Sequence, residues 1–292
     1  MSERITGHTE LIGLMAYPIR HSSSPAMQNE AFAKLGYDYA YLAFEVGADE
    51  IEDAVNAIRT LKMRGSNVSM PNKTLVGQYL DELSPAAEMC GAVNTIVNDH
   101  GHLTGHITDG IGFMAALKDN NIDAIGKKMT IVGAGGAATA IEIQAALDGV
   151  GEIVIFNRKD DFWGRAVSTV EKINTRTSSH AVLYDLADLD KLKEEIAKAD
   201  ILVNGTMAGM KPHEDVSLIT DKSVFRPDLV VCDVVYNPEE TRLLREAREA
   251  GCAKTIGGKG MLLWQGVAAY KLYTGLDMPV EEYKKFQAEN AK

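Results

Sequence analysis

The chain has 292 residues, which is enough for one large domain or two ordinary ones. Its net charge of -11 and the lack of a basic stripe argue against nucleic-acid binding. No apolar run approaches the ~18 residues that span a membrane, and the first residues lack the apolar core of a signal peptide. Three cysteines share no metal-ligand spacing, so we expect reduced thiols, no metal site and a cytoplasmic protein.

Short apolar stretches alternate with amphipathic ones in the first half of the chain. Strands are predicted at 10–18, 39–46 and 67–70, and helices at 24–36, 49–65, 72–83, 85–91 and 109–120. Two strand-like arms in 92–108 flank Asp99-His100-Gly101, which predicts a β-hairpin. This alternation is typical of an α/β fold with a mostly parallel sheet.

A second strand–helix series begins after Asn120, Asn121 and Gly126, which form a plausible linker. Strands are predicted at the start of 127–149 and at 152–158, 180–186, 200–206, 229–238 and 254–258. Helices are predicted in the rest of 127–149, from about 160 to 177, and at 189–199, 240–251, 260–275 and 279–292.

A glycine-rich loop follows the strand that opens this second series. Gly133, Gly135 and Ala138 have the spacing G-x-G-x-x-A, with an apolar strand before them and a helix-forming run after them. In this context the first glycine permits a tight turn, the second lets a pyrophosphate approach the backbone, and the helix N-terminus supplies free N–H groups. The loop predicts a dinucleotide site; the alternative is an ordinary tight turn.

The next strand ends in FNRKDD, where a dinucleotide domain meets the adenosine ribose. A carboxylate at this position accepts from the 2′-hydroxyl of NAD, whereas an arginine accommodates the 2′-phosphate of NADP. The chain supplies both Arg158 and Asp160. We expect Asp160 to face the ribose and repel the phosphate, so NAD is predicted as the preferred cofactor and NADP as the alternative.

Lys73 and Asp109 are the candidates for the chemical step. Oxidation of an alcohol needs a group that takes the hydroxyl proton as the hydride leaves. Each residue lies where a strand-like segment gives way to a helix, and such ends gather around ligand sites in α/β sheets. The alternatives are a solvated lysine and a helix N-cap. Short neutral polar side chains that suit a small polyhydroxylated ligand occur at Ser22, Ser24, Asn67, Ser69, Asn94 and Gln265.

Ten short motifs, in chain order, resemble those of the shikimate dehydrogenases, and most closely the quinate/shikimate dehydrogenase branch. They are HSSSP, NVSMPNK, GAVNTI, TDG, GAGGAA, FNR, NGT, the GM that follows NGTMA, VYNP and GMLLWQG. The resemblance covers nearly the whole chain. Ten motifs in the same order are far more specific evidence for a family than any single motif.

The resemblance implies two α/β domains. Residues 1–119 with 262–292 would form a substrate-binding domain with a mostly parallel sheet, and 120–261 a Rossmann domain that binds NAD(P). The implied activity is the reversible interconversion of shikimate and 3-dehydroshikimate, a step of aromatic amino acid biosynthesis by the chorismate pathway. Quinate and 3-dehydroquinate are an open second pair.

The resemblance also implies roles for single residues. The positions that match Lys73 and Asp109 form the catalytic pair, and the six polar residues named above bind the substrate with them. Cofactor contacts are implied at Gly133, Ala134, Gly135, Gly136, Ala137, Asn157, Arg158, Lys159, Asp160, Met207, Val234, Val235, Tyr236, Asn237 and Gly258.

The chain departs from the family pattern at three positions. Ile107 stands where asparagine is common, Ser69 where threonine is usual, and Met207 where the quinate/shikimate branch can carry a lysine. Asp109 is retained beside Ile107, and Ser69 keeps a hydroxyl. The first departure puts the packing beside Asp109 in question, and the third puts one cofactor contact in question.

Two other functions compete with this interpretation. A two-domain dehydrogenase acting on a folate or an amino acid would not need HSSSP and the Lys73/Asp109 pair, and a non-enzymatic NAD-binding regulator would not need the pair. We expect a small-molecule partner, shikimate or quinate, and neither nucleic acid nor membrane. The sequence leaves open the preferred acid, the direction of the reaction and the oligomeric state, for which a homodimer is the candidate.

Overall fold

The computed structural model describes residues 5–290, which form two compact units. The first unit comprises the residues up to Thr108 and those from Gly266 onward, and the second is Asp109–Gln265. The sequence-based boundaries place helix α4 (Asp109–Asp119) with the first unit, whereas the structure groups it with the second. The reason is its tight packing on α5 (Gly136–Asp148): a Cβ on Gly110 would lie 2.2 Å from the Ala140 carbonyl oxygen.

No helix in residues 5–290 combines the length and the apolar character needed to span a membrane.

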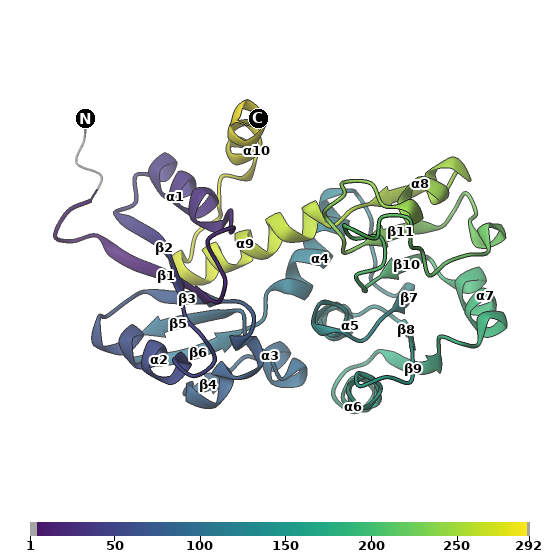
Figure 1. The fold of residues 1–292 in the computed structure, drawn as a ribbon, viewed down its shortest axis with the longest axis horizontal. Helices are drawn as coiled ribbons and strands as arrows, with labels where there is room; N and C mark the ends of the chain where they lie inside the picture. The colour runs from purple at the N-terminus through teal and green to yellow at the C-terminus, as the bar shows by residue number, and fades with distance from the viewer. Residues whose placement is uncertain (1–4, 291–292) are drawn as a thin grey trace. The chain divides into compact units, whose positions relative to one another are not determined.

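The first unit is built on a six-stranded sheet with the order β2-β1-β3-β5-β6-β4 (Figure 1). Strand β1 pairs in parallel with β2 and β3, and β4 with β6, whereas β5 is antiparallel to both β3 and β6. The strands are β1 (Glu10–Ala16), β2 (Tyr39–Glu45), β3 (Gly65–Val68), β4 (Glu82–Leu83), β5 (Thr95–Asp99) and β6 (His102–His106). The predicted mostly parallel sheet is confirmed.

Helices cover both faces of this sheet. They are α1 (Ser24–Leu35), α2 (Ile51–Thr60), α3 (Pro85–Cys90), α10 (Val280–Asn290) and the part of α9 (Lys259–Thr274) from Gly266 onward. On the face of α1 and α9, the Phe32 and Tyr270 rings stack with centroids 5.2 Å apart. A Cβ on Gly65 would lie 2.1 Å from the Ile96 carbonyl oxygen and 2.8 Å from the Tyr273 ring, so only glycine fits where α9 crosses β3.

The predicted hairpin is confirmed, and the helical pieces predicted over 72–83 are confirmed up to Tyr79 but not at Glu82–Leu83. His100 and Gly101 take positive φ values of 52° and 101°, as a two-residue hairpin turn requires. Residues 72–83 form two 3-10 turns, η1 (Asn72–Thr74) and η2 (Val76–Tyr79), followed by β4. Glu82 and Leu83 are strand rather than helix because they pair with Thr104 and Gly105 of β6, a tertiary contact that overrides local helix preference.

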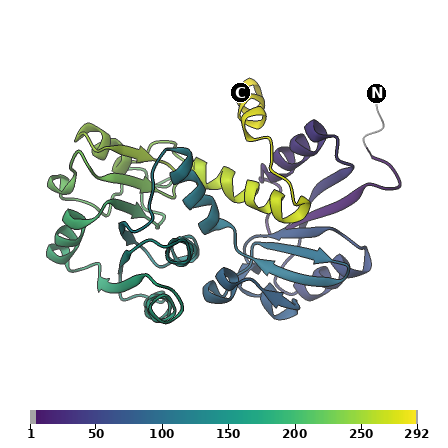
Figure 2. The same ribbon diagram turned by 180° about the vertical axis from the view of Figure 1, so that it is seen from behind.

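The second unit is a doubly wound sheet, seen from behind in Figure 2, with the order β12-β11-β10-β7-β8-β9. All of its pairs are parallel, and read from β9 the order is the 3-2-1-4-5-6 of dinucleotide-binding folds. The strands are β7 (Lys128–Val132), β8 (Glu152–Asn157), β9 (His180–Asp185), β10 (Ile201–Asn204), β11 (Val230–Asp233) and β12 (Lys254–Ile256).

Besides α4, α5 and the first residues of α9, this unit contains α6 (Trp163–Arg176), α7 (Leu189–Lys198), η3 (Lys222–Val224) and α8 (Arg242–Glu249). Residues of α7 and α8 pack with the sheet in one apolar cluster that includes Phe156, Leu192, Leu202 and Leu243. The unit therefore has a core of its own.

Candidate active site

Lys73 lies in the turn η1, just after β3, and its backbone is held on both sides. The N–H of Asn72 donates to the Ser69 carbonyl at 2.9 Å, and the buried Asn72 side chain donates to the Val46 carbonyl at 2.9 Å. The Lys73 carbonyl accepts from the Val93 N–H at 2.8 Å. The Lys73 side chain is half-buried and starts from a rigid point of the chain.

Asn94 continues this hydrogen-bonded path toward the start of α4. It is 3% exposed, its side-chain oxygen accepts from the Thr108 N–H at 2.9 Å, and its amide donates to the Thr108 hydroxyl at 3.0 Å. Asp109 follows Thr108 directly in the chain. Two adjacent residues, Val93 and Asn94, thus join the backbone of Lys73 to the residue before Asp109.

Tyr41 connects other predicted polar residues of the first unit. It is fully buried on β2, its hydroxyl donates to Asn67 Oδ1 at 2.8 Å, and it also makes a side-chain hydrogen bond with Ser24. Burial raises the pKa of the Tyr41 phenol well above its ordinary value, so the hydroxyl remains neutral. The Asn67 amide donates to the Asn94 carbonyl at 3.0 Å and to the Thr95 hydroxyl at 2.9 Å.

The remaining predicted substrate residues lie on both units. The Ser22 hydroxyl accepts from the Ser24 N–H at 3.2 Å, and the Ser69 N–H donates to the Met15 carbonyl at 3.0 Å, which continues the ladder beyond β3. Gln265 belongs to the second unit, on α9, which packs against α4: a Cβ on Gly112 would lie 2.5 Å from the Gln265 nitrogen. Ile107 is 4% exposed and therefore acts as a packing residue beside Thr108.

Two residues that position this network were not found from the sequence. Tyr41 has the pattern of an ordinary inward-facing strand residue, and Asn72 that of a turn residue. The one available signal for Asn72 was its place between Pro71 and Lys73. Nothing in the sequence indicated the hydrogen bonds of Tyr41, because its partner Asn67 lies 26 residues further along the chain.

The glycine loop of the second unit has the geometry of a dinucleotide turn. Gly133 takes a φ of 116°, and a Cβ there would lie 2.7 Å from Thr206 Cγ2. Gly135 is the N-cap of α5, and a Cβ added to Gly135 or Gly136 would meet nothing within 4 Å. The two glycines thus leave space beside the first N–H groups of α5. An anionic pyrophosphate can approach a helix N-terminus of this kind.

Two later loops carry the other predicted cofactor residues. Met207 is 76% exposed and Tyr236 is 47% exposed, whereas the side chain of Val235 is fully buried. The backbone of Val235 is also occupied, since its N–H donates to Asp233 and its carbonyl accepts from the Gly258 N–H at 3.1 Å. Val235 thus belongs to the core that supports this loop, and Tyr236 is the exposed side chain beside it.

The turn after β8 explains which charges face outward. Asp160 Oδ1 accepts from the Asn157 amide and from the Phe162 N–H, both at 3.0 Å, so this carboxylate closes the turn. The side chains of Arg158 and Lys159 are 78% and 69% exposed. Each cation has a carboxylate beside it: Arg158 lies 3.7 Å from Asp160 Oδ2, and Lys159 lies 3.4 Å from Asp185 Oδ2. Asp161 in the same turn is exposed as well.

A doubly wound sheet with a glycine turn at its switch point binds dinucleotides. In this chain such a sheet is joined to a second α/β unit that has a buried polar network beside a lysine. This combination is typical of two-unit, nicotinamide-dependent dehydrogenases. Two family patterns match the chain: the shikimate dehydrogenase substrate binding domain at residues 14–96 and the shikimate 5′-dehydrogenase C-terminal domain at residues 258–284.

Whole-chain comparisons identify the family. The shikimate dehydrogenase (NADP(+)) of Listeria innocua is 61% identical over 98% of both chains. The structure of shikimate 5-dehydrogenase from Listeria monocytogenes, in complex with shikimate and NAD, is 61% identical with a TM-score of 0.95, over 98% of this chain and 99% of that one. Quinate dehydrogenase from Corynebacterium glutamicum, in complex with NAD, is 31% identical with a TM-score of 0.84, over 96% and 99%. The chain belongs to the shikimate dehydrogenase family of oxidoreductases.

The predicted preference for NAD is wrong. Three Listeria relatives at 61% identity are named as NADP(+) enzymes, which favours NADP, although the Listeria monocytogenes structure holds NAD. The physical reason is the surroundings of Asp160, whose Oδ1 is bound within its own turn to Asn157 and Phe162 and whose Oδ2 lies 3.7 Å from the Arg158 guanidinium. The argument for NAD required that carboxylate to face the ribose.

Proposed function

We propose that the protein is an NADP-dependent shikimate dehydrogenase that interconverts shikimate and 3-dehydroshikimate. The observation that carries the catalytic part is the hydrogen-bonded path from the Lys73 backbone through Val93 and Asn94 to Thr108, the neighbour of Asp109. A path of this kind holds an acid–base residue in place without using its charged end. In this proposal the first unit binds the substrate and the second binds the cofactor.

Lys73 and Asp109 have distinct roles in the proposed reaction. Lys73 takes the proton of the reacting hydroxyl during oxidation and returns it during reduction, and Asp109 orients the ammonium group. NADP, when bound, supplies the hydride acceptor. The proton and the hydride leave the same carbinol group, so one alcohol becomes one ketone and the balance is complete.

The other polar residues of the first unit, with Gln265, hold the acid in this proposal. The hydroxyls of Ser22, Ser24 and Ser69 can donate to a carboxylate or accept from a ring hydroxyl. Both amide hydrogens of Asn67 are already used by Asn94 and Thr95, and its oxygen accepts from Tyr41, so in this proposal Asn67 contributes the second lone pair of that oxygen to a substrate hydroxyl. These neutral groups suit a small polyhydroxylated acid.

The cofactor part of the proposal uses the glycine loop for the pyrophosphate and the β8 turn for the adenosine ribose. Arg158 and Lys159 extend from this turn and are the proposed cationic partners for a 2′-phosphate, which would compete with their ion pairs to Asp160 and Asp185 at 3.7 and 3.4 Å. The Lys159 ammonium lies 5.7 Å from the centroid of the Trp163 ring, which offers an aromatic face beside the same turn. Arg158→Ala should therefore raise the KM for NADP and change the KM for NAD less.

Quinate is the proposed second substrate, with shikimate preferred. The likeness to the Corynebacterium glutamicum quinate dehydrogenase supports this, and the half-buried hydroxyls of Ser22 and Ser24 are the proposed partners for the extra hydroxyl of quinate. Steady-state kinetics on both acids tests the ranking. Activity on quinate alone would overturn it.

The test of the whole proposal uses the purified full chain, shikimate or quinate, and NADP or NAD. The reduced nicotinamide is followed by its absorbance. We expect turnover with shikimate and a higher kcat/KM for NADP than for NAD. No turnover of shikimate with either cofactor would refute the proposed function.

Location and assembly are further parts of this proposal. The three cysteines are free thiols in the described part of the chain, which supports a reducing compartment such as the cytoplasm. For the assembly we propose a homodimer, because β2 is an edge strand and Leu42 on it is 51% exposed. Sedimentation at several protein concentrations tests it, and a monomer at all of them would contradict it.

A further inference from the structure

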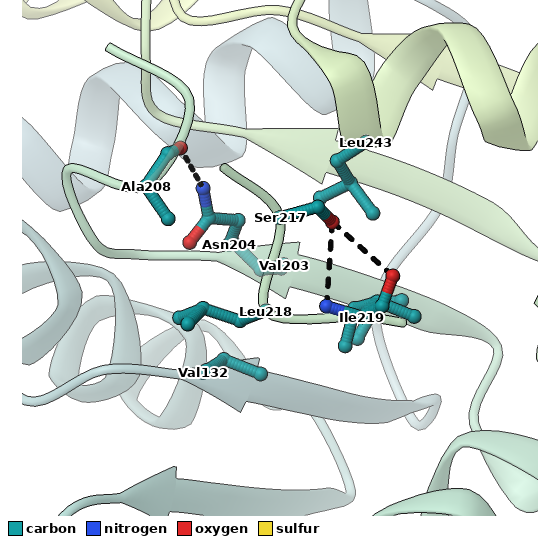
Figure 3. Close-up of a pocket in the computed structure, with 9 residues that line it drawn as sticks. Val132, Val203, Asn204, Ala208, Ser217, Leu218, Ile219 and Leu243 are labelled. Carbon is teal, nitrogen blue, oxygen red and sulfur yellow. Dashed lines mark hydrogen bonds between the residues drawn. The ribbon is translucent and has the colours of Figure 1, made fainter. Parts of the chain in front are cut away.

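Asn204 ends β10 and closes the loop that follows. Its side-chain oxygen accepts from the N–H and the hydroxyl of Thr206, at 3.1 and 2.7 Å. Its amide donates to the Ala208 carbonyl at 3.1 Å, as Figure 3 shows, and to Asp233 Oδ1 at 3.0 Å. One buried side chain therefore fixes loop 205–208 and ties it to the next strand of the sheet.

Asp233 does the same at the end of β11. It is 2% exposed, and its Oδ1 accepts from the Val235 N–H at 3.0 Å as well as from Asn204. Its Oδ2 accepts from the Thr241 hydroxyl at 2.7 Å, and Thr241 is the N-cap of α8. Because every partner of this carboxylate is a donor, the ionised form satisfies the network.

The packing around this network leaves little space for the loops to move. A Cβ on Gly258 would lie 2.2 Å from the Val234 carbonyl oxygen, and a Cβ on Gly209, which has a φ of 88°, would lie 3.2 Å from Thr241 Cβ. A small cavity is lined by Asn204, Ala208 and Ser217 together with apolar side chains (Figure 3). Its size suits about one water molecule, so we assign it no ligand.

Sheet order assigns these loops to one half of a dinucleotide. The glycine loop follows β7, the central strand, and the turn after β8 meets the adenosine ribose. Strands β10 and β11 lie on the other side of β7. The loops that follow them therefore serve the nicotinamide half.

We propose that Asn204, Asp233 and Thr241 form a positioning network that sets loops 205–208 and 234–237 for the nicotinamide end of the cofactor. This inference rests on the proposed function. The three side chains are buried, so they act through the loops that carry Met207 and Tyr236. A network that only stabilised the fold would instead have no preference for one half of the cofactor.

Two conservative variants test this on the full chain. Thr241→Val removes the hydroxyl and keeps the shape, and Asp233→Asn replaces one acceptor by a donor that faces the Thr241 hydroxyl. Both should weaken NADPH binding and lower kcat at saturating shikimate by about 10–100-fold, the usual result of misplacing a reacting group. Binding of 2′,5′-ADP, which lacks the nicotinamide half, should be unchanged.

Matched controls separate positioning from stability. Thr241→Ser keeps the hydroxyl and should restore both kcat and NADPH affinity. Asp188→Ala removes a side-chain cap from α7, whose partner is the Lys191 N–H at 2.9 Å, without touching either loop. It should lower the melting temperature and leave the cofactor parameters unchanged.

The outcomes distinguish the two proposals. Equal loss of NADPH and 2′,5′-ADP binding in Thr241→Val, or unchanged NADPH binding and kcat, would overturn the positioning role. Thr241→Val decides the matter if Asp233→Asn fails to fold. The comparison of NADPH with 2′,5′-ADP binding needs no substrate. A failure to turn over shikimate would therefore refute the proposed function and leave this test of the positioning network valid.

Discussion

Glu142 in α5 gives the second unit a pH-dependent weakness. The residue is fully buried, and both of its carboxyl oxygens lack a hydrogen-bond partner among the described residues. Burial raises the pKa of Glu142 to about 8, and attraction from Arg165 offsets only part of that increase. At neutral pH the carboxyl is therefore mostly protonated in the folded state and ionised in the unfolded state.

The sign and size of the effect follow from this difference. The folded pKa of about 8 lies above the ordinary 4.5, so the folded state holds an extra proton between these values and stability falls as pH rises. The slope is about 1.4 kcal/mol per pH unit in this window. Between about pH 5.5 and pH 8.5 the wild type should lose about 3 kcal/mol relative to Glu142→Met, which has no charge to bury.

The measurement is urea unfolding at several pH values, followed by tryptophan fluorescence. Both tryptophans of the chain, Trp163 and Trp264, lie in the second unit, so the signal reports on that unit. Glu171→Met, at an exposed position of α6, is the matched control and should keep the wild-type pH dependence. Parallel stability curves for wild type and Glu142→Met would refute the reasoning.

Three further predictions concern the proposed site and the second unit. Lys73→Ala should lower turnover by about 10²–10⁴-fold with little change in KM, and Lys285→Ala is the exposed control. If Lys73 and Asp109 act as a unit, the double variant Lys73→Ala/Asp109→Asn should turn over almost as fast as Lys73→Ala alone. Tyr41→Phe removes the donor to Asn67 and should raise the KM for shikimate about tenfold but not that for NADP; an unchanged shikimate KM would exclude this role. Glu195→Gln removes the charge of a buried carboxylate that pairs with the half-buried Lys128 and Lys191, at 2.6 and 2.8 Å, and should lower the free energy of unfolding of the second unit by about 1–3 kcal/mol in the same urea assay.

Features that depend on neighbouring residues were predictable from the sequence. The Asp99-His100-Gly101 turn is an example, because its central residues tolerate the positive φ that a two-residue hairpin needs. The glycine loop is another, since Gly133 has a φ of 116° and the helix begins at Gly136. Alternating strands and helices likewise predicted two α/β units, and ten short motifs predicted the family that the comparisons then showed.

Features that depend on distant partners were decided only by the tertiary structure. The end of the range 72–83 is the strand β4 rather than helix because Glu82 and Leu83 pair with β6, which lies about 20 residues further along the chain. Asp160 was expected at the ribose, but whether a carboxylate faces outward depends on which donors the folded turn presents, here Asn157 and Phe162.

The buried polar networks show the same dependence over longer separations. Tyr41 meets Asn67, and Asn204 meets Asp233, across 26 and 29 residues of sequence. The local pattern of apolar and polar residues indicates whether such a side chain faces the core. It does not indicate which polar atom the side chain contacts there. That pairing arises when strands come together in a sheet, because a buried polar group must find a partner where water is excluded.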